Sequence, residues 1–555
     1  MIIDMTSIES KDPSPDRQQE QTRSALGRLA GDPLLWLALA LTVAVCLAVF
    51  NHVHYINGPT APKQWQWPYR HRDIFLQSCL GALWRLALGG ALIGGIAWLI
   101  RRRMLPGVTR HWIGLAALFC WGVLFVWTNL ITATPMRLSH LPRVIKSQIW
   151  TSYFNVAQWI QSGRLPPLGD TLERYSELLP QFPLHASTHP PGAVLSSYGL
   201  LRFFQSHPAL SMAMGNFYQK IGADPDLAGV EKFTSDDVTA LSLGILVTLA
   251  GQLGVFPLFW LVKRALKETD DTGQECSAER TAWVAALLWV HYPALVLMTP
   301  AFDLMHPALT LLCIYFTMRG LQDRPIAWGV ALALLFMAGI TFTFTLLLLA
   351  PMLCVMALLE LCRRADSLRP KALLQQASLA NPGGKSLWTL VAVTVITCLL
   401  ADLLLRHIFG IHLWRTFFAA IQLQNDVHLA KLNRTFQVWV FYNIWDFLLF
   451  AGMPLAIFAI AWFARVFREW WRKPATIVPS LAIFPLMVLV VDLSHQLSAE
   501  TARVWLFLAS GMVWAGAAEL VRRYGKHWRW VLAAVLLAQT VFIYLCRTRM
   551  QLWGY

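Results

Sequence analysis

Residues 135–237 form the longest polar interval between the apolar segments of this chain. Within it, SQIWTSYFNVAQWIQSG (Ser147–Gly163) places apolar side chains at helical spacing, and Gly163 is a typical helix stop. HPPG (His189–Gly192) predicts a rigid turn, because each proline fixes its own φ and restricts the preceding residue. Loops of this length in compact proteins are usually functional. We interpret the rest of the chain as a scaffold that holds this loop at one face of a membrane.

The composition predicts an all-α polytopic membrane protein. The 555 residues are 56% hydrophobic and only 14% charged, with a mean hydropathy of +0.49. A net charge of +15 would indicate a nucleic-acid partner in a soluble protein, but here the basic residues lie mostly in short loops between apolar segments. The expected partner is therefore the lipid bilayer, with no nucleic acid. The nine cysteines show no metal-ligand spacing, so neither a zinc site nor a disulfide framework is expected.

About thirteen transmembrane helices are predicted from apolar segments long enough to cross a bilayer. The distribution of Lys and Arg places the N-terminus in the cytoplasm and the C-terminus outside, in a multi-pass protein of the inner (plasma) membrane. The predicted units are a disordered cytoplasmic head (1–33), two additional helices (34–110) and a core (111–555) with an extracytoplasmic loop (132–237). The predicted spans are 34–50, 79–100, 111–131, 238–262, 281–300, 303–319, 326–341, 343–362, 386–405, 441–464, 476–493, 504–521 and 529–546.

The short stretch 192–204 after the HPPG turn is apolar but is too short to span a bilayer, so it predicts a helix lying along the membrane surface. Several polar side chains from distant parts of the sequence are expected at the same outer face. A carboxylate at the end of a span is costly unless it is paired or functional, and neighbouring cations suit a phosphate. The candidates are His189, Asp303, His306, Lys431, Arg434, Glu500, Arg503 and, in the loop, Asp170.

Each candidate also has a purely structural alternative. His189 could brace the proline turn, and Asp303 could cap the helix that follows it. Glu500 and Arg503 are three residues apart and could pair only with each other. Asp170 lies in a charged segment that is typical of a solvated face.

The order of a span, a long outer loop with an amphipathic helix, an HPP turn, a surface helix and many further spans resembles the GT-C class of membrane glycosyltransferases. It is most similar to the protein-mannosyltransferase type, through Tyr153-Phe154-Asn155-Val156-Ala157, Gly163 and His189-Pro190-Pro191-Gly192. The resemblance implies an enzyme of the cell envelope that takes a hexosyl or pentosyl group from a polyprenyl-phosphate-linked sugar. The acceptor would be a glycan, lipid or protein, and the sugar carbon would be inverted.

The chain departs from the family at the start of the loop, where the family usually carries an acidic residue and this sequence has Ile149-Trp150. The usual base is therefore missing or displaced, and Asp303, Glu500 and Asp170 are the candidates to replace it. We expect Asp303, Glu500 and His189 to be catalytic. The residues expected to bind substrate are Arg503, Arg434, Lys431, His306 and Asp170.

Two other functions remain open at this point. A transporter or flippase would need deep charged groups and an internal repeat, whereas the sequence shows Asp402 and no repeat. A non-catalytic or differently catalytic lipid-processing relative is favoured by the missing acidic residue. No cofactor is expected, and the sequence leaves dependence on a divalent cation open.

Overall fold

The structure, a computed structural model, shows an all-helical chain, as predicted from the sequence. One isolated antiparallel bridge joins Tyr69 to Met550, and the described residues contain no strand. The described residues are 31–59, 66–69, 74–102, 107–134, 136–183, 185–228, 230–267, 275–364, 375, 377–426, 434–472, 481 and 483–553.

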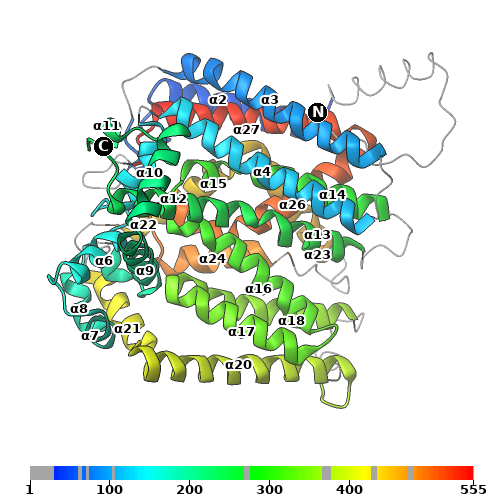
Figure 1. Ribbon diagram of the computed structural model, residues 1–555. Coiled ribbons are helices and arrows are strands. Elements are labelled where there is room, and N and C mark those ends of the chain that lie inside the picture. Colours follow the sequence, from blue (N-terminus) through cyan, green and yellow to red (C-terminus); the bar gives the residue numbers. More distant parts are fainter. Residues whose placement is uncertain are drawn as a thin grey trace.

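The long helices run roughly side by side, and a group of short helices covers one end of them (Figure 1). Among the described residues, nine helices are long and apolar enough to cross a membrane, or ten if one bent pair counts as a single span. The helices of the bundle are α2 (Pro33–Phe50), α3 (Phe75–Arg102), α4 (Gly107–Ala133), α12 (Ser235–Leu253), α13 (Val255–Lys267), α14 (Glu275–Val290), α15 (Pro293–Leu297), α16 (His306–Gly320), α17 (Pro325–Phe342), α18 (Leu349–Arg364), α20 (Pro382–Phe409), α22 (Phe436–Ala451), α23 (Met453–Arg472), α24 (Ile483–Ser494), α26 (Ala509–Tyr524) and α27 (Trp528–Arg549).

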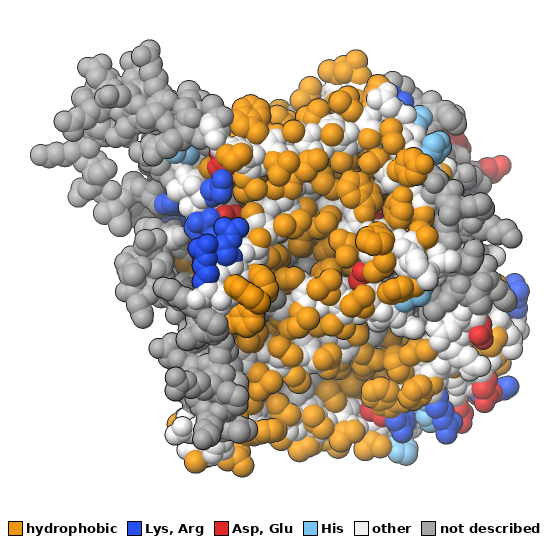
Figure 2. Space-filling view, turned by 180° about the vertical axis from the view of Figure 1, so that it is seen from behind, with side chains coloured by type: hydrophobic (Ala, Val, Ile, Leu, Met, Phe, Trp, Pro, Cys, Tyr) orange, Lys and Arg blue, Asp and Glu red, His pale blue; other side chains and the backbone are white. Residues whose placement is uncertain are grey.

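The surface of the bundle is apolar where a bilayer would surround it. Figure 2 shows a broad band of hydrophobic side chains across the middle of one face, with charged side chains gathered toward its edges. Large apolar side chains such as Leu88 and Leu537 are two-thirds exposed. By contrast, 89% of the most apolar part of the segment Ser277–Leu297, which contains most of α14, is buried inside the bundle. The chain is therefore a polytopic membrane protein.

The helix count differs from the thirteen predicted spans because several apolar segments form short or bent helices. Helices α16, α24 and α26 have 15, 12 and 16 residues, fewer than the roughly 20 residues of a typical membrane-spanning helix. The predicted span 441–464 instead forms parts of two helices, α22 and α23, and the chain bends by 113° between them. Gly452 lies at the bend with φ +89°, a conformation that favours glycine.

The predicted outer loop folds into a group of short helices, which we call the cap. Both predicted helices are present, as α6 (Tyr153–Gln161) and α9 (Gly192–Ser206), and they pack on each other. At Gly192 an added Cβ would lie 2.3 Å from the carbonyl oxygen of Thr341, so only glycine lets α9 begin against the end of α17. The other cap helices are α5 (His140–Ile145), α7 (Leu168–Glu173), α8 (Tyr175–Leu178), α10 (Pro208–Lys220) and α11 (Pro225–Ala228).

Candidate functional site

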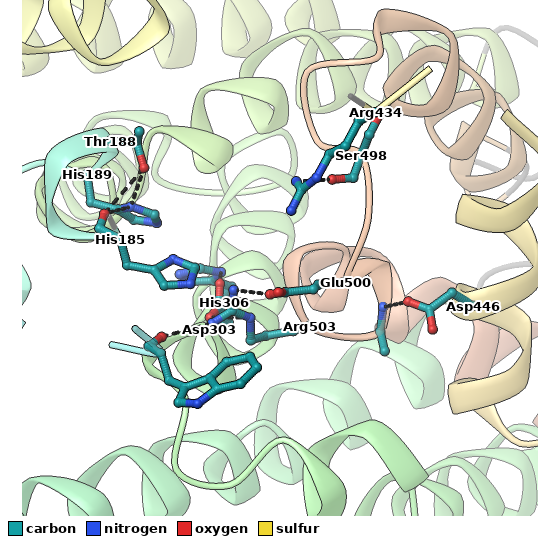
Figure 3. A network of polar contacts seen from close by, with 12 residues as sticks. His185, Thr188, His189, Asp303, His306, Arg434, Asp446, Ser498, Glu500 and Arg503 are labelled. Carbon is teal, nitrogen blue, oxygen red and sulfur yellow. Dashed lines mark hydrogen bonds and ion pairs between the residues drawn. The ribbon is translucent and has the colours of Figure 1, made fainter. Parts of the chain in front are cut away.

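Polar side chains from distant segments of the sequence come together at the cap end of the bundle (Figure 3). Asp303 lies in the 3₁₀ helix η4 (Phe302–Met305), and His306 is the first residue of α16. Glu500 and Arg503 lie at the two ends of the short segment that contains α25 (Thr501–Val504). His189 follows the 3₁₀ helix η3 (Ala186–Thr188). The structure brings these residues together at one end of the bundle, and their position on the outer membrane face stays a prediction.

Arg503 is at the centre of the cluster and is only 6% exposed. Its Nη2 donates to Glu500 Oε2 at 2.5 Å, and its Nε lies 3.6 Å from Asp303 Oδ2. Its Nη1 donates to the carbonyl oxygen of Trp150 at 3.3 Å. Burial alone would lower the pKa of this guanidinium, but the charges of Glu500 and Asp303 raise it above its ordinary value. Arg503 is therefore a permanent cation that links the cap to both carboxylates.

These contacts exclude two of the structural alternatives. No side-chain capping bond is present at the start of η4 or of α16, so Asp303 is not a helix cap. Glu500 and Arg503 do not pair only with each other, because Arg503 also contacts Asp303. The side chains of the two carboxylates are 13% and 11% exposed, so both keep some access to solvent or a ligand.

Trp150, near the start of the cap, also contacts this arginine. Its carbonyl oxygen and the carboxylate of Asp303 contact the same guanidinium, that of Arg503. Arg503 therefore links the start of the cap to the segment that carries Asp303.

His189 is held in one orientation by the turn that precedes it. Its Nδ1 lies 2.7 Å from the carbonyl oxygen of His185, and its ring packs edge-on against Tyr153 at 5.5 Å. Burial lowers the pKa of His189, although Asp303 opposes this effect. The imidazole is therefore neutral at pH 7, with its proton on Nδ1 and a lone pair on Nε2. His189 braces the turn, as the structural alternative proposed, and it also presents an acceptor nitrogen.

Arg434 is a second cation at the site. Its Nη1 donates to the carbonyl oxygen of Ser498 at 2.7 Å. Burial lowers the pKa of Arg434, while the charge of Glu500 acts in the opposite direction. Lys431, the other cation expected from this part of the sequence, lies outside the described residues.

Three nitrogen atoms of the cluster are buried without a hydrogen-bond acceptor. They are His306 Nδ1, Arg434 Nε and Arg503 Nε. Two of them face Asp303 only at ion-pair distance, with His306 Nδ1 3.8 Å from Oδ1. Buried polar groups are nearly always hydrogen-bonded in native proteins. Several unsatisfied nitrogens around two carboxylates indicate a site that a polar ligand completes.

The segment before α25 has an unusual backbone. His495, Ala499 and Glu500 all have positive φ values, 57°, 67° and 54°, although none of them is glycine. Non-glycine residues in this region cost free energy and persist only where their surroundings hold them. The side chain of Glu500 is therefore aimed by a constrained loop.

Two polar residues of α22, which sequence reasoning missed as part of the site, hold this loop. Asn443 Oδ1 accepts from the backbone N–H of Ala499 at 2.9 Å, and Asp446 Oδ2 accepts from that of Ala502 at 2.9 Å. Thr501 Oγ1 donates to the carbonyl oxygen of Asn443 at 2.7 Å. The signal in the sequence was a pair of buried polar residues three positions apart within the apolar segment 441–464.

Asp170 is not part of the cluster. It is exposed on α7, in agreement with the solvated-face alternative. No group of three or more His, Cys, Asp or Glu side chains that could hold a metal ion is found in the described part of the chain.

No family model matches the sequence, and no curated protein matches it. Among solved structures, the crystal structure of the Archaeoglobus fulgidus oligosaccharyltransferase, in complex with Zn and sulfate, aligns with a TM-score of 0.40 and 13% identity. The alignment covers 78% of this chain and 53% of that one, so this chain matches about half the length of the archaeal protein.

Proposed function

We propose that this protein is an integral membrane glycosyltransferase. It would move a sugar from a polyprenyl-phosphate donor to a hydroxyl of a glycan, lipid or protein acceptor on the extracytoplasmic face. The observation that carries the proposal is the pair of partly accessible carboxylates, Asp303 and Glu500, on one buried arginine at the cap end of the bundle. Arg434 Nε, a buried cationic nitrogen without a hydrogen-bond partner, suits a phosphate.

Asp303 is the proposed general base. It takes the proton of the acceptor hydroxyl while the acceptor oxygen bonds to the anomeric carbon. The bond between that carbon and the phosphate oxygen breaks, and the phosphate leaves with the electron pair, so the carbon is inverted. Glu500 is held more closely by Arg503, at 2.5 Å against 3.6 Å, which leaves Asp303 the more mobile carboxylate.

The other residues then take distinct roles. All three guanidinium nitrogens of Arg503 face protein oxygens. Arg503 therefore holds the two carboxylates and is not assigned to bind the donor phosphate, which is the role that the sequence had suggested. Arg434, whose Nε has no acceptor, is the proposed cation for the leaving phosphate, with His306 beside it. A neutral His189 cannot donate from Nε2, so we assign it to accept a hydrogen bond from a substrate hydroxyl.

The bundle also holds an apolar groove of about 500 Å³ that suits a polyprenyl chain. Helices α17, α18 and α20 line it, together with Leu413, Trp414 and Phe417 of the short helix α21 (Leu413–Leu423). Helix α21 packs on η3, the turn directly before His189. A chain in this groove would therefore carry its phosphate toward the cluster.

The experiment that tests the proposal uses the purified full chain in lipid vesicles with polyprenyl-phosphate sugars as donors. Transfer to a hydroxyl acceptor, lost in Asp303→Asn at normal protein abundance, is the expected result. Movement of an intact lipid-linked sugar across the vesicle without transfer would instead make the protein a flippase.

A further inference from the structure

The connection between α2 and α3, the two helices predicted as additions to the core, reaches the helix that supports the candidate site. It is described over residues 51–59 and 66–69, and its Trp67 is buried. The indole N–H of Trp67 donates to Asp446 Oδ1 of α22 at 2.8 Å. The indole ring also packs on Phe450 of the same helix, with ring centroids 5.6 Å apart. A tryptophan from outside the predicted core therefore belongs to the surroundings of Asp446.

Asp446 connects this tryptophan to the loop that carries Glu500 (Figure 3). Its other oxygen, Oδ2, accepts from the backbone N–H of Ala502 at 2.9 Å and from Thr501 Oγ1 at 3.1 Å. Among the described residues, Trp67 is the one donor to Oδ1. Hydrogen bonds weaken when their angles change, so a carboxylate that turned after losing the indole donor would also weaken its bonds to the loop.

The backbone of Trp67 is itself held by two other parts of the chain. Asn57 Nδ2 donates to the carbonyl oxygen of Trp67 at 2.6 Å, and the backbone N–H of Trp67 donates to the carbonyl oxygen of Asn57 at 2.8 Å. The backbone N–H of Gln551, which follows α27, donates to the carbonyl oxygen of Pro68 at 2.6 Å. The indole donor is therefore fixed in place before it meets Asp446.

The residues after α27 connect the same region to the other side of the site. Met550 forms the isolated bridge with Tyr69, and Trp553 is buried. The ring of Trp553 meets that of Trp150 edge-on, with centroids 5.7 Å apart. The carbonyl oxygen of Trp150 accepts from Arg503. The α2–α3 connection and the residues after α27 thus pair with each other and contact both sides of the candidate site.

We propose that Trp67 is a positioning residue for the candidate site. Its indole N–H orients the carboxylate of Asp446, and Asp446 holds the backbone directly after Glu500. Glu500 has a φ of +54°, which a non-glycine residue keeps only where its surroundings hold it. The expected effect on turnover rests on the proposed transferase activity, whereas the expected effect on the loop does not.

The first test is amide hydrogen exchange, measured by mass spectrometry on the full chain in detergent. Trp67→Phe keeps an aromatic ring against Phe450 but removes the N–H, so exchange at the Ala502 amide should rise about tenfold, the equivalent of one hydrogen bond. The matched control is Trp289→Phe in α14. Trp289 is also buried, and its indole donates to the carbonyl oxygen of Gly251 at 3.2 Å, so this variant should leave exchange at Ala502 unchanged.

The second test asks whether Trp67 acts through Asp446. Asp446→Asn keeps the shape of the side chain but has one acceptor oxygen, so it cannot satisfy both the indole and the loop. Asp446→Asn alone should raise exchange at Ala502, and adding Trp67→Phe should not raise it further, because coupled residues are not additive. Fully additive effects would mean that Trp67 only fills space, and would overturn the proposal.

The third test is sugar transfer by the same proteins. Trp67→Phe should lower turnover several-fold with little change in the donor Michaelis constant, and Trp289→Phe should keep both. Equal changes in the two variants, or none in Trp67→Phe, would overturn the positioning role. Raised exchange at Ala502 in a chain whose wild type transfers no sugar would support that role and contradict the proposed function.

A further variant covers the case in which Trp67→Phe does not accumulate. Asn57→Ala leaves the indole intact but removes the bond to the Trp67 carbonyl oxygen. Exchange at Ala502 should rise in the same direction, though by less than tenfold. Unchanged exchange in Asn57→Ala would then overturn the proposal.

Discussion

The charged side chains at the two ends of α16 differ in how far they are buried. At the cap end, Asp303 and Glu500 surround Arg503, and the charged side chains are 6–13% exposed. At the other end, Lys263 and Arg319 keep about a quarter of their side-chain surface exposed. Buried charges must be paired, because desolvation is costly, whereas partly exposed charges keep some of their hydration. The difference separates a closely packed, buried cluster of charges from a set of more exposed ion pairs.

The largest expected effect is on the arginine that holds the cluster together. Arg503→Ala leaves two buried carboxylates without their cation, which should cost about 3–5 kcal/mol of stability. The unfolding midpoint in detergent measures this loss. Arg434→Ala is the matched control, since within the described residues the Arg434 side chain makes one hydrogen bond, to Ser498, and its loss should reduce stability far less. Equal stability of the two variants would contradict a central role for Arg503.

The second prediction concerns the proposed base. Asp303→Asn keeps the shape of the side chain but cannot take a proton, so turnover should fall about 100-fold or more at normal abundance. Initial rates of sugar transfer with saturating donor measure the effect. The same substitution in the cap at exposed Asp226 should leave turnover unchanged. Near-normal turnover in Asp303→Asn, together with an inactive Glu500→Gln, would transfer the role of base to Glu500.

The third prediction is the pH dependence of His189. Its folded pKa is lowered by burial, so below the ordinary value of 6.5 the unfolded chain binds more protons than the folded one. Stability should therefore decrease as the pH falls from 6.5 toward the folded pKa. His189→Gln should reduce this slope in unfolding midpoints measured between neutral and mildly acidic pH.

A control for His189 is present in the same cap. His207 is exposed, and its Nδ1 lies 2.9 Å from the carbonyl oxygen of Phe203, four residues earlier. His189 makes the same kind of contact with the carbonyl oxygen of His185, but it is buried. His207→Gln, which removes an exposed imidazole with the same local contact, is the matched control for the slope of His189→Gln. An identical slope in wild type and His189→Gln would mean that burial at the HPPG turn does not control this histidine.

Sequence reasoning found the site residues that lie directly beside predicted span ends. Asp303 and Arg503 were identified because charge at such positions is costly, and the basic loops defined which end they share. The same reasoning missed the support from Asn443 and Asp446. Mean hydropathy reports how apolar a segment is but not whether its helix is straight. Gly452 was therefore the only feature of the sequence that marked the 113° bend between α22 and α23.

The smallest expected effect tests whether that support matters to the cluster. Thr501 donates to the Asn443 carbonyl oxygen and to Asp446 Oδ2, at 2.7 and 3.1 Å, and is fully buried. Thr501→Val keeps the side-chain shape but removes both bonds, which should cost about 1 kcal/mol of stability. Because Thr501 follows Glu500, the loosened loop should also lower turnover several-fold, with little change in the donor Michaelis constant.

The control for this prediction is Thr248→Val in α12. Thr248 is also buried, but its hydroxyl donates only within its own helix, to the carbonyl oxygen of Gly244 at 2.7 Å. The two variants should lose comparable stability, while only Thr501→Val should lose turnover. Equal turnover in both would mean that the strained loop keeps its shape without α22. The rigidity that distinguishes the cap end of α16 from its other end would then have to come from Arg503 alone.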